Sequence, residues 1–344
     1  MMRLTPNPEA YPRLRLWLER WWLSHRPTHL WRWFFAGFVA WLLFVIIGLP
    51  FMLPLGGPKT VHPSTLADPN GAFVQIEGES LYYVHEPGDG ETVILIHGFG
   101  GSTVTWQATI PALKDAGYNV FALDLRGFGL SEKGLDGDYS HPAQAERIVR
   151  FMDVMGIEQA HLVGHSMGGN VVTHVALSHP DRVSKLVLVD AAIVTQDARS
   201  IPDLVFEIPF ARRWAQIVMR RLVDTVSKDM LYDAAGKDSQ ISNGVLEDYR
   251  RALYTPEWDL GLIGIMRDSD HNALPEPVSA IQAPTLILWG DSDTWVAPGY
   301  GANLEEMIPN ARRVEFAGAG HLPMHEVPDE FNTVLLEFLG EPMP

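Results

Sequence analysis

A serine in a short glycine-bounded segment is the first residue with a clear chemical use. Ser166 lies in Gly164-His-Ser-Met-Gly168, after the apolar run His161–Val163 and before a helix-forming stretch from Asn170 to Ser178. A serine on such a sharp strand-to-helix turn exposes its hydroxyl, and side chains at the two glycine positions would collide in the turn. The N-terminus of the following helix favours developing negative charge. Ser166 is therefore predicted to be a nucleophile.

A histidine in a glycine-rich loop can supply the base that this serine needs. His321 follows Gly318-Ala-Gly320, just after the strand-like run Arg313–Phe316. Reactive groups gather in loops at the ends of strands. His325 lies four residues further on, has no glycine-rich loop of its own, and is expected at the start of the last helix. His321 is therefore the predicted general base.

The base in turn needs a carboxylate that holds its imidazole in the correct tautomer and stabilises the imidazolium that forms. Three aspartates are candidates for this role. Asp291 and Asp293 follow the apolar run Thr285–Trp289, and Asp190 follows the run Leu186–Val189.

A second glycine-rich segment, His97-Gly-Phe-Gly-Gly101, follows the apolar run Val93–Ile96. Backbone N–H groups at this place, and directly after the nucleophile, bind the oxyanion of the tetrahedral intermediate in acyl transfer. We predict the N–H groups of Phe99 and Met167 as these donors. His97 itself is expected to brace the loop without taking part in the chemistry.

Short, continuously apolar runs must carry these loops, and such runs are typical of strands covered on both faces. They are Val93–Ile96, Val120–Leu123, His161–Val163, Leu186–Val189 and Thr285–Trp289. Helix-forming stretches lie between most of them, which predicts a mostly parallel sheet with helices on both faces. Two earlier runs, Phe73–Ile76 and Leu81–His85, are predicted to form an antiparallel hairpin.

The alternation of strands and helices stops between about Ala192 and Pro284. This segment is rich in helix formers and aromatic residues and has no clear strand. Long insertions in compact domains are commonly functional lids. We predict a helical cap over 192–284, inserted into a core formed by 71–191 and 285–344. The alternative is a plain helical extension of the core.

The N-terminal region has the composition of a membrane anchor. No charged residue occurs from Trp33 to Pro58, and a helix of about 20 apolar residues crosses the roughly 30 Å hydrocarbon layer. We predict a transmembrane helix over 33–53 and a linker over 54–70. A cleaved signal peptide and a buried helix of a soluble protein are the alternatives. The long leader and the lack of Ala-x-Ala after Leu49 disfavour cleavage.

Charge predicts the orientation of this anchor. Residues 1–32 hold six arginines and two glutamates, or +4, whereas the whole chain carries −16, so the remainder carries −20. Positive flanks stay in the cytoplasm, which places 1–32 in the cytoplasm or at its membrane interface and the acidic body on the opposite side. Such an acidic body disfavours nucleic acid as a partner. Because the chain has no cysteine, thiolate catalysis, disulfides and cysteine-ligated metals are excluded.

From about Phe73 to the C-terminus the chain resembles the α/β-hydrolase superfamily. The resemblance rests on the segments His97-Gly-Phe-Gly-Gly, Asp124-Leu-Arg-Gly-Phe-Gly-Leu-Ser131, Gly164-His-Ser-Met-Gly, Gly290-Asp-Ser-Asp293 and Gly318-Ala-Gly-His321. It implies a doubly wound sheet of about eight strands, a cap after the sixth strand, and no metal or organic cofactor. The order serine, aspartate, histidine favours Asp293 as the acid; Asp291 would then cap the turn.

The resemblance narrows the activity only in part. Ser166 stands where haloalkane dehalogenases and epoxide hydrolases carry aspartate, and Gly-Phe-Gly-Gly after His97 differs from the Gly-Pro-Gly-like element usual in carbon–carbon bond hydrolases and proline iminopeptidases. Membrane-anchored esterases and monoacylglycerol lipases look closer. We therefore predict a single-pass membrane serine hydrolase that cleaves apolar or lipid-like carboxylic esters through an acyl-enzyme.

Several alternatives stay open on the same fold. They are lactone opening, amide cleavage, carbon–carbon bond hydrolysis and cofactor-free perhydrolysis. A scaffold that binds a ligand without catalysis is the alternative from another class, and it is disfavoured because a binder needs no triad.

Overall fold

The computed structural model describes residues 16–17, 20–21, 24, 29–194, 206–236 and 241–342. The chain divides into two compact units, Met1–Pro54 and Leu55–Pro344. Most of the basic segment predicted over 1–32 lies outside the described residues.

Residues 29–52 of the first unit form one continuous helix. It consists of α2 (His29–Leu43), a π-helical turn (Phe44–Gly48) and α3 (Leu49–Met52). Its stretch Trp31–Met52 is, by length and composition, long and apolar enough to cross a membrane. The helix begins four residues before the predicted start at Trp33. It also continues past Pro50, with the wider π turn just before this proline, which has no N–H to donate to the preceding turn.

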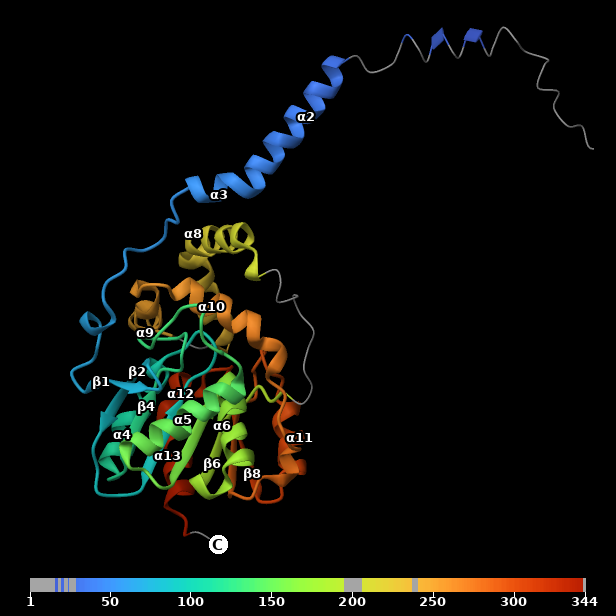
Figure 1. The fold of residues 1–344 in the computed structure, drawn as a ribbon. Helices are drawn as coiled ribbons and strands as arrows, with labels where there is room; N and C mark the ends of the chain where they lie inside the picture. The colour runs from blue at the N-terminus through green and yellow to red at the C-terminus, as the bar shows by residue number, and fades with distance from the viewer. Residues whose placement is uncertain are drawn as a thin grey trace, which may run out of the picture. The chain divides into compact units, whose positions relative to one another are not determined.

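An eight-stranded sheet forms the centre of the second unit (Figure 1). Its strands are β1 (Gly71–Ile76), β2 (Glu79–Glu86), β3 (Thr92–Ile96), β4 (Asn119–Leu123), β5 (Ala160–His165), β6 (Val183–Val189), β7 (Thr285–Gly290) and β8 (Ala311–Phe316). Their order is β1-β2-β4-β3-β5-β6-β7-β8. β2 pairs antiparallel with β1 and β4, and all other pairs are parallel. The predicted hairpin and mostly parallel sheet are confirmed.

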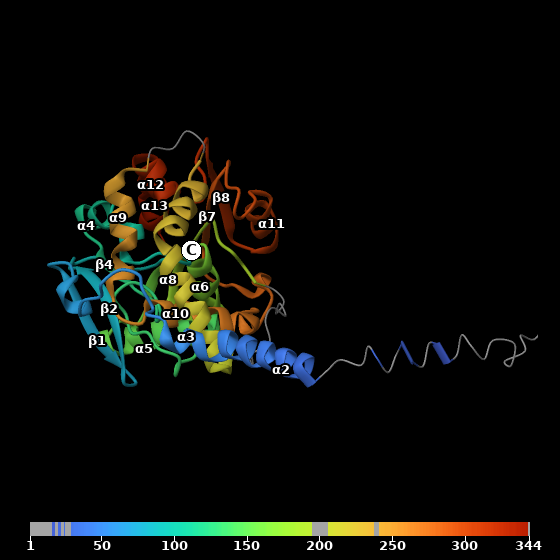
Figure 2. The same ribbon diagram turned by 90° about the horizontal axis from the view of Figure 1, so that it is seen from above.

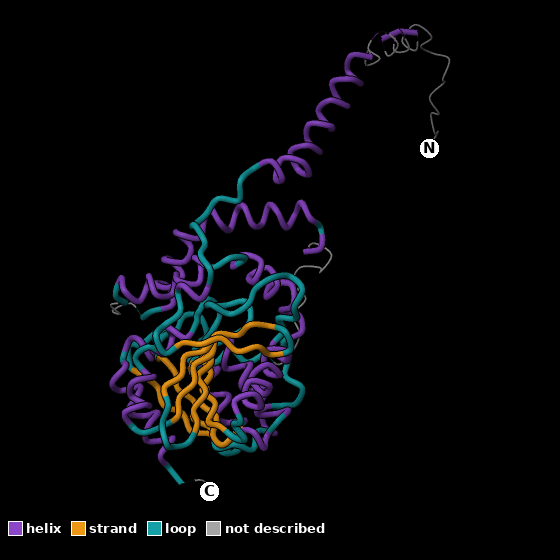
Figure 3. Tube along the Cα trace, turned by 60° about the vertical axis from the view of Figure 1, so that its left-hand side comes forward, coloured by secondary structure: helices purple, strands orange, loops and turns teal. Residues whose placement is uncertain are grey.

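Helices cover both faces of this sheet, as Figure 3 shows. Two buried apolar clusters lie on the two faces: one includes side chains of α5, α6 and α11, the other side chains of α4 and α13. These helices are α4 (Thr109–Asp115), α5 (His141–Met155), α6 (Met167–Ser178), α11 (Gly299–Met307) and α13 (Pro328–Gly340). Every residue of β5, β6 and β7 is buried, which explains their uninterrupted apolar sequences.

Helix α5 shows how the sequence sets an element's ends. The Ser140 side chain accepts a hydrogen bond from the N–H of Ala143, and Pro142 occupies the first turn, where its missing N–H costs nothing. Gly156 ends the helix at φ 69°, a left-handed conformation that glycine adopts without strain.

Three longer helices lie between β6 and β7, where the sequence predicts the cap. They are α8 (Pro209–Ala234), α9 (Asn243–Arg250) and α10 (Trp258–Arg267). Figures 1 and 2 show them gathered on one side of the second unit. In the described part of 192–284 the regular structure is entirely helical.

Candidate active site

Ser166 lies on the turn between β5 and α6, at the carboxyl edge of the sheet. Its backbone adopts φ 51° and ψ −119°, a conformation that costs a non-glycine residue about 1–3 kcal/mol. Hydrogen bonds to neighbouring loops hold it there. Its N–H donates to the carbonyl of Val189 at 2.9 Å, and its carbonyl accepts from Gly169 and Ala192. The strained serine is thus tied through both its N–H and its carbonyl to the end of β6 and the residues after it.

The glycines around Ser166 are required by space. A Cβ on Gly168 would lie 2.4 Å from the carbonyl oxygen of His97, and one on Gly164 would lie 2.5 Å from the carbonyl oxygen of Gly168. Both approaches are closer than any real Cβ contact. The expectation that side chains would collide in this turn is met at both positions.

The loop after β3 packs directly on the nucleophile turn. A Cβ on Gly98 would lie 2.9 Å from the Cβ of Ser166, so the backbone that carries Phe99 runs beside the serine. His97 holds this loop: its Nε2 accepts the N–H of Leu125 at 3.0 Å, and its Nδ1 therefore carries the proton and donates to the carbonyl of Gly98 at 2.7 Å. Burial lowers the pKa of His97, which keeps it neutral. Both ring nitrogens of His97 therefore hold backbone groups in place.

His321 and Asp293 are brought together from loops 28 residues apart. The Nδ1–H of His321 donates to Asp293 Oδ2 at 2.7 Å, and both side chains are buried. The other oxygen, Oδ1, accepts the backbone N–H groups of Trp295 at 2.7 Å and Val296 at 3.0 Å. Three donors thus fix the carboxylate and, through it, the orientation of the imidazole.

Asp291 lies outside this contact. It is exposed, and its Oδ1 accepts the backbone N–H of Gly318 at 2.8 Å and the hydroxyl of Ser292 at 2.9 Å. It caps the loop that leads to His321. Of the two aspartates that follow β7, Asp293 is the one that contacts the imidazole.

His325 lies apart from the Asp293 contact. It belongs to the single-turn helix α12 (Pro323–Glu326), which precedes the last helix α13, so its predicted place at the start of that helix is wrong. Pro328 begins a new helix, because a proline fits only the first turn. His325 Nε2 lies 3.0 Å from the hydroxyl of Tyr249 on α9. Burial lowers the pKa of His325 to about 4, so its ring stays neutral at pH 7. The Tyr249 hydroxyl also donates to Oγ1 of Thr105 at 3.3 Å.

Two further residues hold the His321 loop, and no sequence pattern predicted either role. The carboxylate of Glu326 accepts the backbone N–H groups of Gly320 and Leu322, on both sides of His321. His165 Nε2 donates to the carbonyl of His321 at 2.7 Å. Burial lowers the pKa of His165 well below its usual range, so its ring stays neutral. The sequence separates His165 from His321 by 156 residues.

Ser166 and His321 line one cavity of about 190 Å³, together with Phe99. Cap residues close it from the other side with largely apolar side chains: Val223, Val226, Met230, Leu231, Leu253, Trp258 and Leu262. No hydrogen bond joins the described side chains of Ser166 and His321, and such catalytic contacts commonly tighten only when substrate is bound. The roles of Phe99 and Met167 as oxyanion donors stay predictions.

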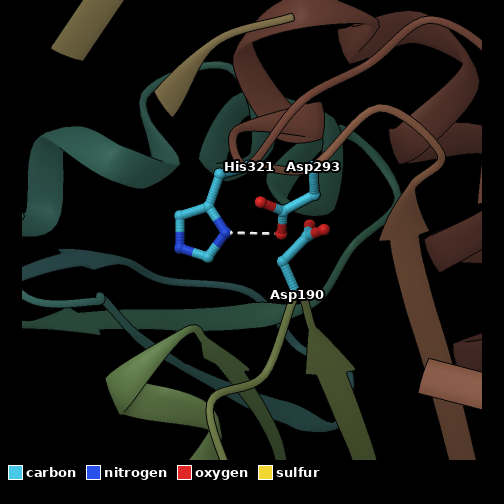
Figure 4. A group of neighbouring side chains, drawn as sticks. All are labelled: Asp190, Asp293 and His321. Atoms are coloured by element: carbon cyan, nitrogen blue, oxygen red, sulfur yellow. Dashed lines mark hydrogen bonds and ion pairs between the residues drawn. The ribbon is translucent and has the colours of Figure 1, made fainter. Parts of the chain in front are cut away.

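Asp190, Asp293 and His321 form the group of side chains whose spacing also suits a metal ion, among the residues that the structure describes. One donor atom from each lies within 4.8 Å of the others (Figure 4). The donors present argue for a different use of this group. His321 and two backbone N–H groups already occupy both oxygens of Asp293, which leaves a cation one fully available oxygen, on Asp190.

Comparisons with known proteins agree with this architecture. The model of the α/β-hydrolase fold family matches residues 91–328. A protein of Variovorax paradoxus, provisionally named the carbamate hydrolase RutD, is 46% identical over 265 residues, which are 75% of this chain and 95% of that one. The 2-hydroxy-6-oxo-6-phenylhexa-2,4-dienoate hydrolase of Comamonas testosteroni is 28% identical over 76% of this chain and 92% of its own.

A solved structure described as a membrane phospholipase A, a bacterial virulence factor, is 27% identical to this chain with a TM-score of 0.63. The match covers 95% of this chain and 98% of that one. The family match spans more than half of the sequence, and the sheet has the predicted eight strands in mostly parallel order. The chain therefore belongs to the α/β-hydrolase family.

Proposed function

We propose that this protein is a membrane-anchored serine hydrolase that cleaves carboxylic esters with apolar acyl chains. One observation carries the proposal: Ser166 and His321, which is hydrogen-bonded to Asp293, line a cavity whose roof consists largely of apolar side chains. Apolar walls with a few convergent polar groups are typical of sites that bind apolar small molecules. The similarity to a membrane phospholipase A over nearly the whole chain supports the same substrate class.

The chemistry proposed for this site is acyl transfer in two steps. Ser166 Oγ bonds to the ester carbonyl carbon while His321 Nε2 takes its proton, and the N–H groups of Phe99 and Met167 bind the resulting oxyanion. The ester C–O bond then breaks, and the leaving alcohol takes the proton from His321. Water repeats the sequence on the acyl-enzyme and releases the acid and free Ser166.

A fluorophosphonate probe and a series of p-nitrophenyl esters test this proposal. The probe is expected to label the wild type and Ser227→Ala but not Ser166→Ala. Ser227 is a suitable control because it lines the same cavity and its hydroxyl contacts no described partner. Ester turnover is expected to improve with acyl length until the cavity is filled. Labelling that survives in Ser166→Ala would overturn the assignment of the nucleophile.

Carbamate cleavage is the second candidate, because a 46% identical relative carries that name. Carbamates and esters pass through similar tetrahedral intermediates, so the triad serves both. The distinguishing measurement is kcat/KM on a matched pair that differs only in the carbamate nitrogen. A preference for the carbamate would replace the ester proposal while leaving the catalytic residues in place.

The membrane anchor and its orientation are part of the proposal. The helix over Trp31–Met52 supports the anchor, and the excess of arginine in residues 1–32 supports a cytoplasmic N-terminus. Because the chain has no cysteine, single-cysteine variants report orientation without background. The reagent is a maleimide that cannot cross the membrane, added to cells whose outer envelope admits it. It is expected to label Val154→Cys, where the native valine is 57% exposed, and not to label Thr5→Cys. The reverse pattern would invert the orientation, and release by alkaline carbonate would exclude the anchor.

A further inference from the structure

Asp190 is a buried acid that the proposed chemistry does not use. It follows β6, its side chain is fully buried, and its backbone adopts φ 43°. This left-handed conformation is rare for residues other than glycine, and Asp and Asn are among those that tolerate it best. The N–H of Asp190 donates to the carbonyl of Leu288 at 2.9 Å, which ties the turn to the strand that leads to Asp293.

The carboxyl groups of Asp190 and Asp293 point toward each other, as Figure 4 shows. One oxygen of each acid and a ring nitrogen of His321 lie within 4.8 Å of one another. Two carboxylates that share a buried site cannot both ionise without a large electrostatic cost, so one of them retains a proton.

The hydrogen-bond donors around the pair indicate which acid is protonated. Asp293 accepts three N–H donors, from Trp295, Val296 and His321, and such donors favour a carboxylate. Asp190 accepts one described donor: the N–H of Gly290 donates to Oδ1 at 2.9 Å. Asp190 Oδ2 is buried and receives no hydrogen bond from the described donors. With a proton on Oδ2, this oxygen can donate a hydrogen bond to the carboxylate of Asp293.

The charges near Asp190 act in the same direction. Burial raises its pKa well above the usual range, and the nearby charges of Asp293 and Glu326 raise it further, against the Gly290 hydrogen bond. His321 is the titratable group that faces the pair from the loop before α12. With Asp190 neutral, Asp293 is the carboxylate in contact with the imidazolium that forms during acyl transfer.

We propose that Asp190 is a positioning residue of the triad, which stays protonated and donates a hydrogen bond from Oδ2 to the carboxylate of Asp293. This inference rests on the proposed role of the triad. The bond adds a fourth donor to Asp293 and further fixes the orientation of its carboxylate. It also makes the carboxylate less basic, because a donated proton stabilises the charged form.

Two substitutions separate this role from a merely structural one. Asp190→Asn keeps the shape, tolerates the same backbone conformation, and offers an amide N–H in place of the carboxylic O–H. Asp190→Gly removes the side chain without adding backbone strain. Asp291→Asn is the matched control, because it removes an exposed carboxylate from the neighbouring turn. All variants are made in the full chain and measured in detergent micelles.

The first readout is the pH profile of kcat/KM for a short ester, or of the fluorophosphonate labelling rate. Asp190→Asn is expected to stay within about threefold of wild type with an unchanged acid limb. Asp190→Gly is expected to lose about 10- to 100-fold, the worth of one hydrogen bond to a charged group, and its acid limb is expected to move to higher pH. A downward shift of the acid limb in Asp190→Asn would mean that the substitution removed a negative charge, so that Asp190 was ionised. Wild-type behaviour of Asp190→Gly would exclude a positioning role. Either result overturns the proposal.

The second readout needs no substrate, so it distinguishes failure of this inference from failure of the proposed function. The infrared spectrum of the resting protein at pH 7 is expected to contain the C=O stretch of a protonated carboxylic acid. This band is expected to vanish in Asp190→Asn and to persist in Asp291→Asn. If wild type lacks the band, Asp190 is ionised and the proposal fails, whatever bond the protein cleaves.

Discussion

The floor and the roof of the cavity are built from different kinds of contact. The floor consists of the loops 97–101, 127–133, 164–168 and 318–326, and the roof consists of the cavity-lining residues of the cap. Hydrogen bonds and close glycine contacts fix the floor, for example those that Glu326 accepts around His321. The roof offers mainly apolar side chains such as Val226 and Met230. Under the proposed function, this difference assigns the chemical step to the floor and the choice of acyl group to the roof.

The largest expected effect on catalysis comes from removing the predicted general base, His321. His321→Ala should lower kcat by about 10⁶-fold, because triad members act as a unit, while the apolar roof still binds substrate and leaves KM nearly unchanged. Steady-state ester hydrolysis measures both parameters. His179→Ala is the control, since His179 pairs with Glu146 on the surface. Activity above about one percent in His321→Ala would assign the base to another residue.

A single methyl group in the floor tests its packing. Gly98→Ala would place a Cβ 2.9 Å from the Cβ of Ser166 and 2.8 Å from Nδ1 of His165. The loop must then move away, and with it the predicted donor at Phe99, so kcat is expected to fall by about 10²–10³-fold, as for the loss of an oxyanion donor.

Gly299→Ala is the comparison for this variant, because a Cβ there meets nothing within 4 Å and its activity is expected to equal that of wild type. Equal thermal midpoints in both variants separate misplacement from unfolding. Wild-type kcat in Gly98→Ala would show that the Phe99 loop takes no part in catalysis.

The contact between Tyr249 and His325 joins roof to floor and is expected to make the fold sensitive to acid. The folded-state pKa of His325 is about 4, below its ordinary value of 6.5, because of burial. Between these values the unfolded chain binds the proton and the folded chain does not, so stability falls as pH drops from about 6.5 toward 4. By pH 4.5 this one group is expected to cost about 2 kcal/mol.

Urea unfolding of the full chain in micelles, followed by tryptophan fluorescence at pH 7 and 4.5, measures this loss. His325→Gln keeps a side chain that can hydrogen-bond the Tyr249 hydroxyl but does not titrate, so it is expected to lose about 2 kcal/mol less than wild type between the two pH values. An equal loss in both proteins would mean that His325 is already charged in the folded state.

The floor was predictable from the sequence where its contacts are local. Ser166 and its glycines are neighbours in the chain, and their sharp strand-to-helix turn was predicted from that segment alone. Asp293 required the order of the superfamily, because nothing in the residues alone separates it from Asp291. The positions held by Glu326 and His165 depend on contacts across loops, and the hydrogen bond that Asp190 accepts comes from Gly290, 100 residues away. No spacing rule reports such contacts.

The apolar runs likewise predicted the sheet, because each strand that is buried on both faces has an uninterrupted apolar sequence of its own. The beginning of the N-terminal helix at His29 was missed for the opposite reason. Charge and hydropathy indicate which residues of a helix can lie in a bilayer. They do not indicate where the helix begins or ends, because a helix continues as long as its backbone hydrogen bonds can form. The same limit applies to the π-helical turn before Pro50.

The smallest expected effect comes from the roof, and it isolates substrate choice from chemistry. Val226 and Val218 lie on the same helix, α8, and are 45% and 49% exposed, but only Val226 lines the cavity. Val226→Asp places a charge where an acyl chain would lie. It is expected to raise KM for a decanoate ester about five- to tenfold, the worth of one or two methylene groups, with butyrate and kcat nearly unchanged. Val218→Asp adds the same charge to the same helix and is expected to change neither ester. If both variants shift KM equally, the effect is one of surface charge and the roof does not select the acyl group. If kcat falls in Val226→Asp alone, roof and floor are coupled and the division between them fails.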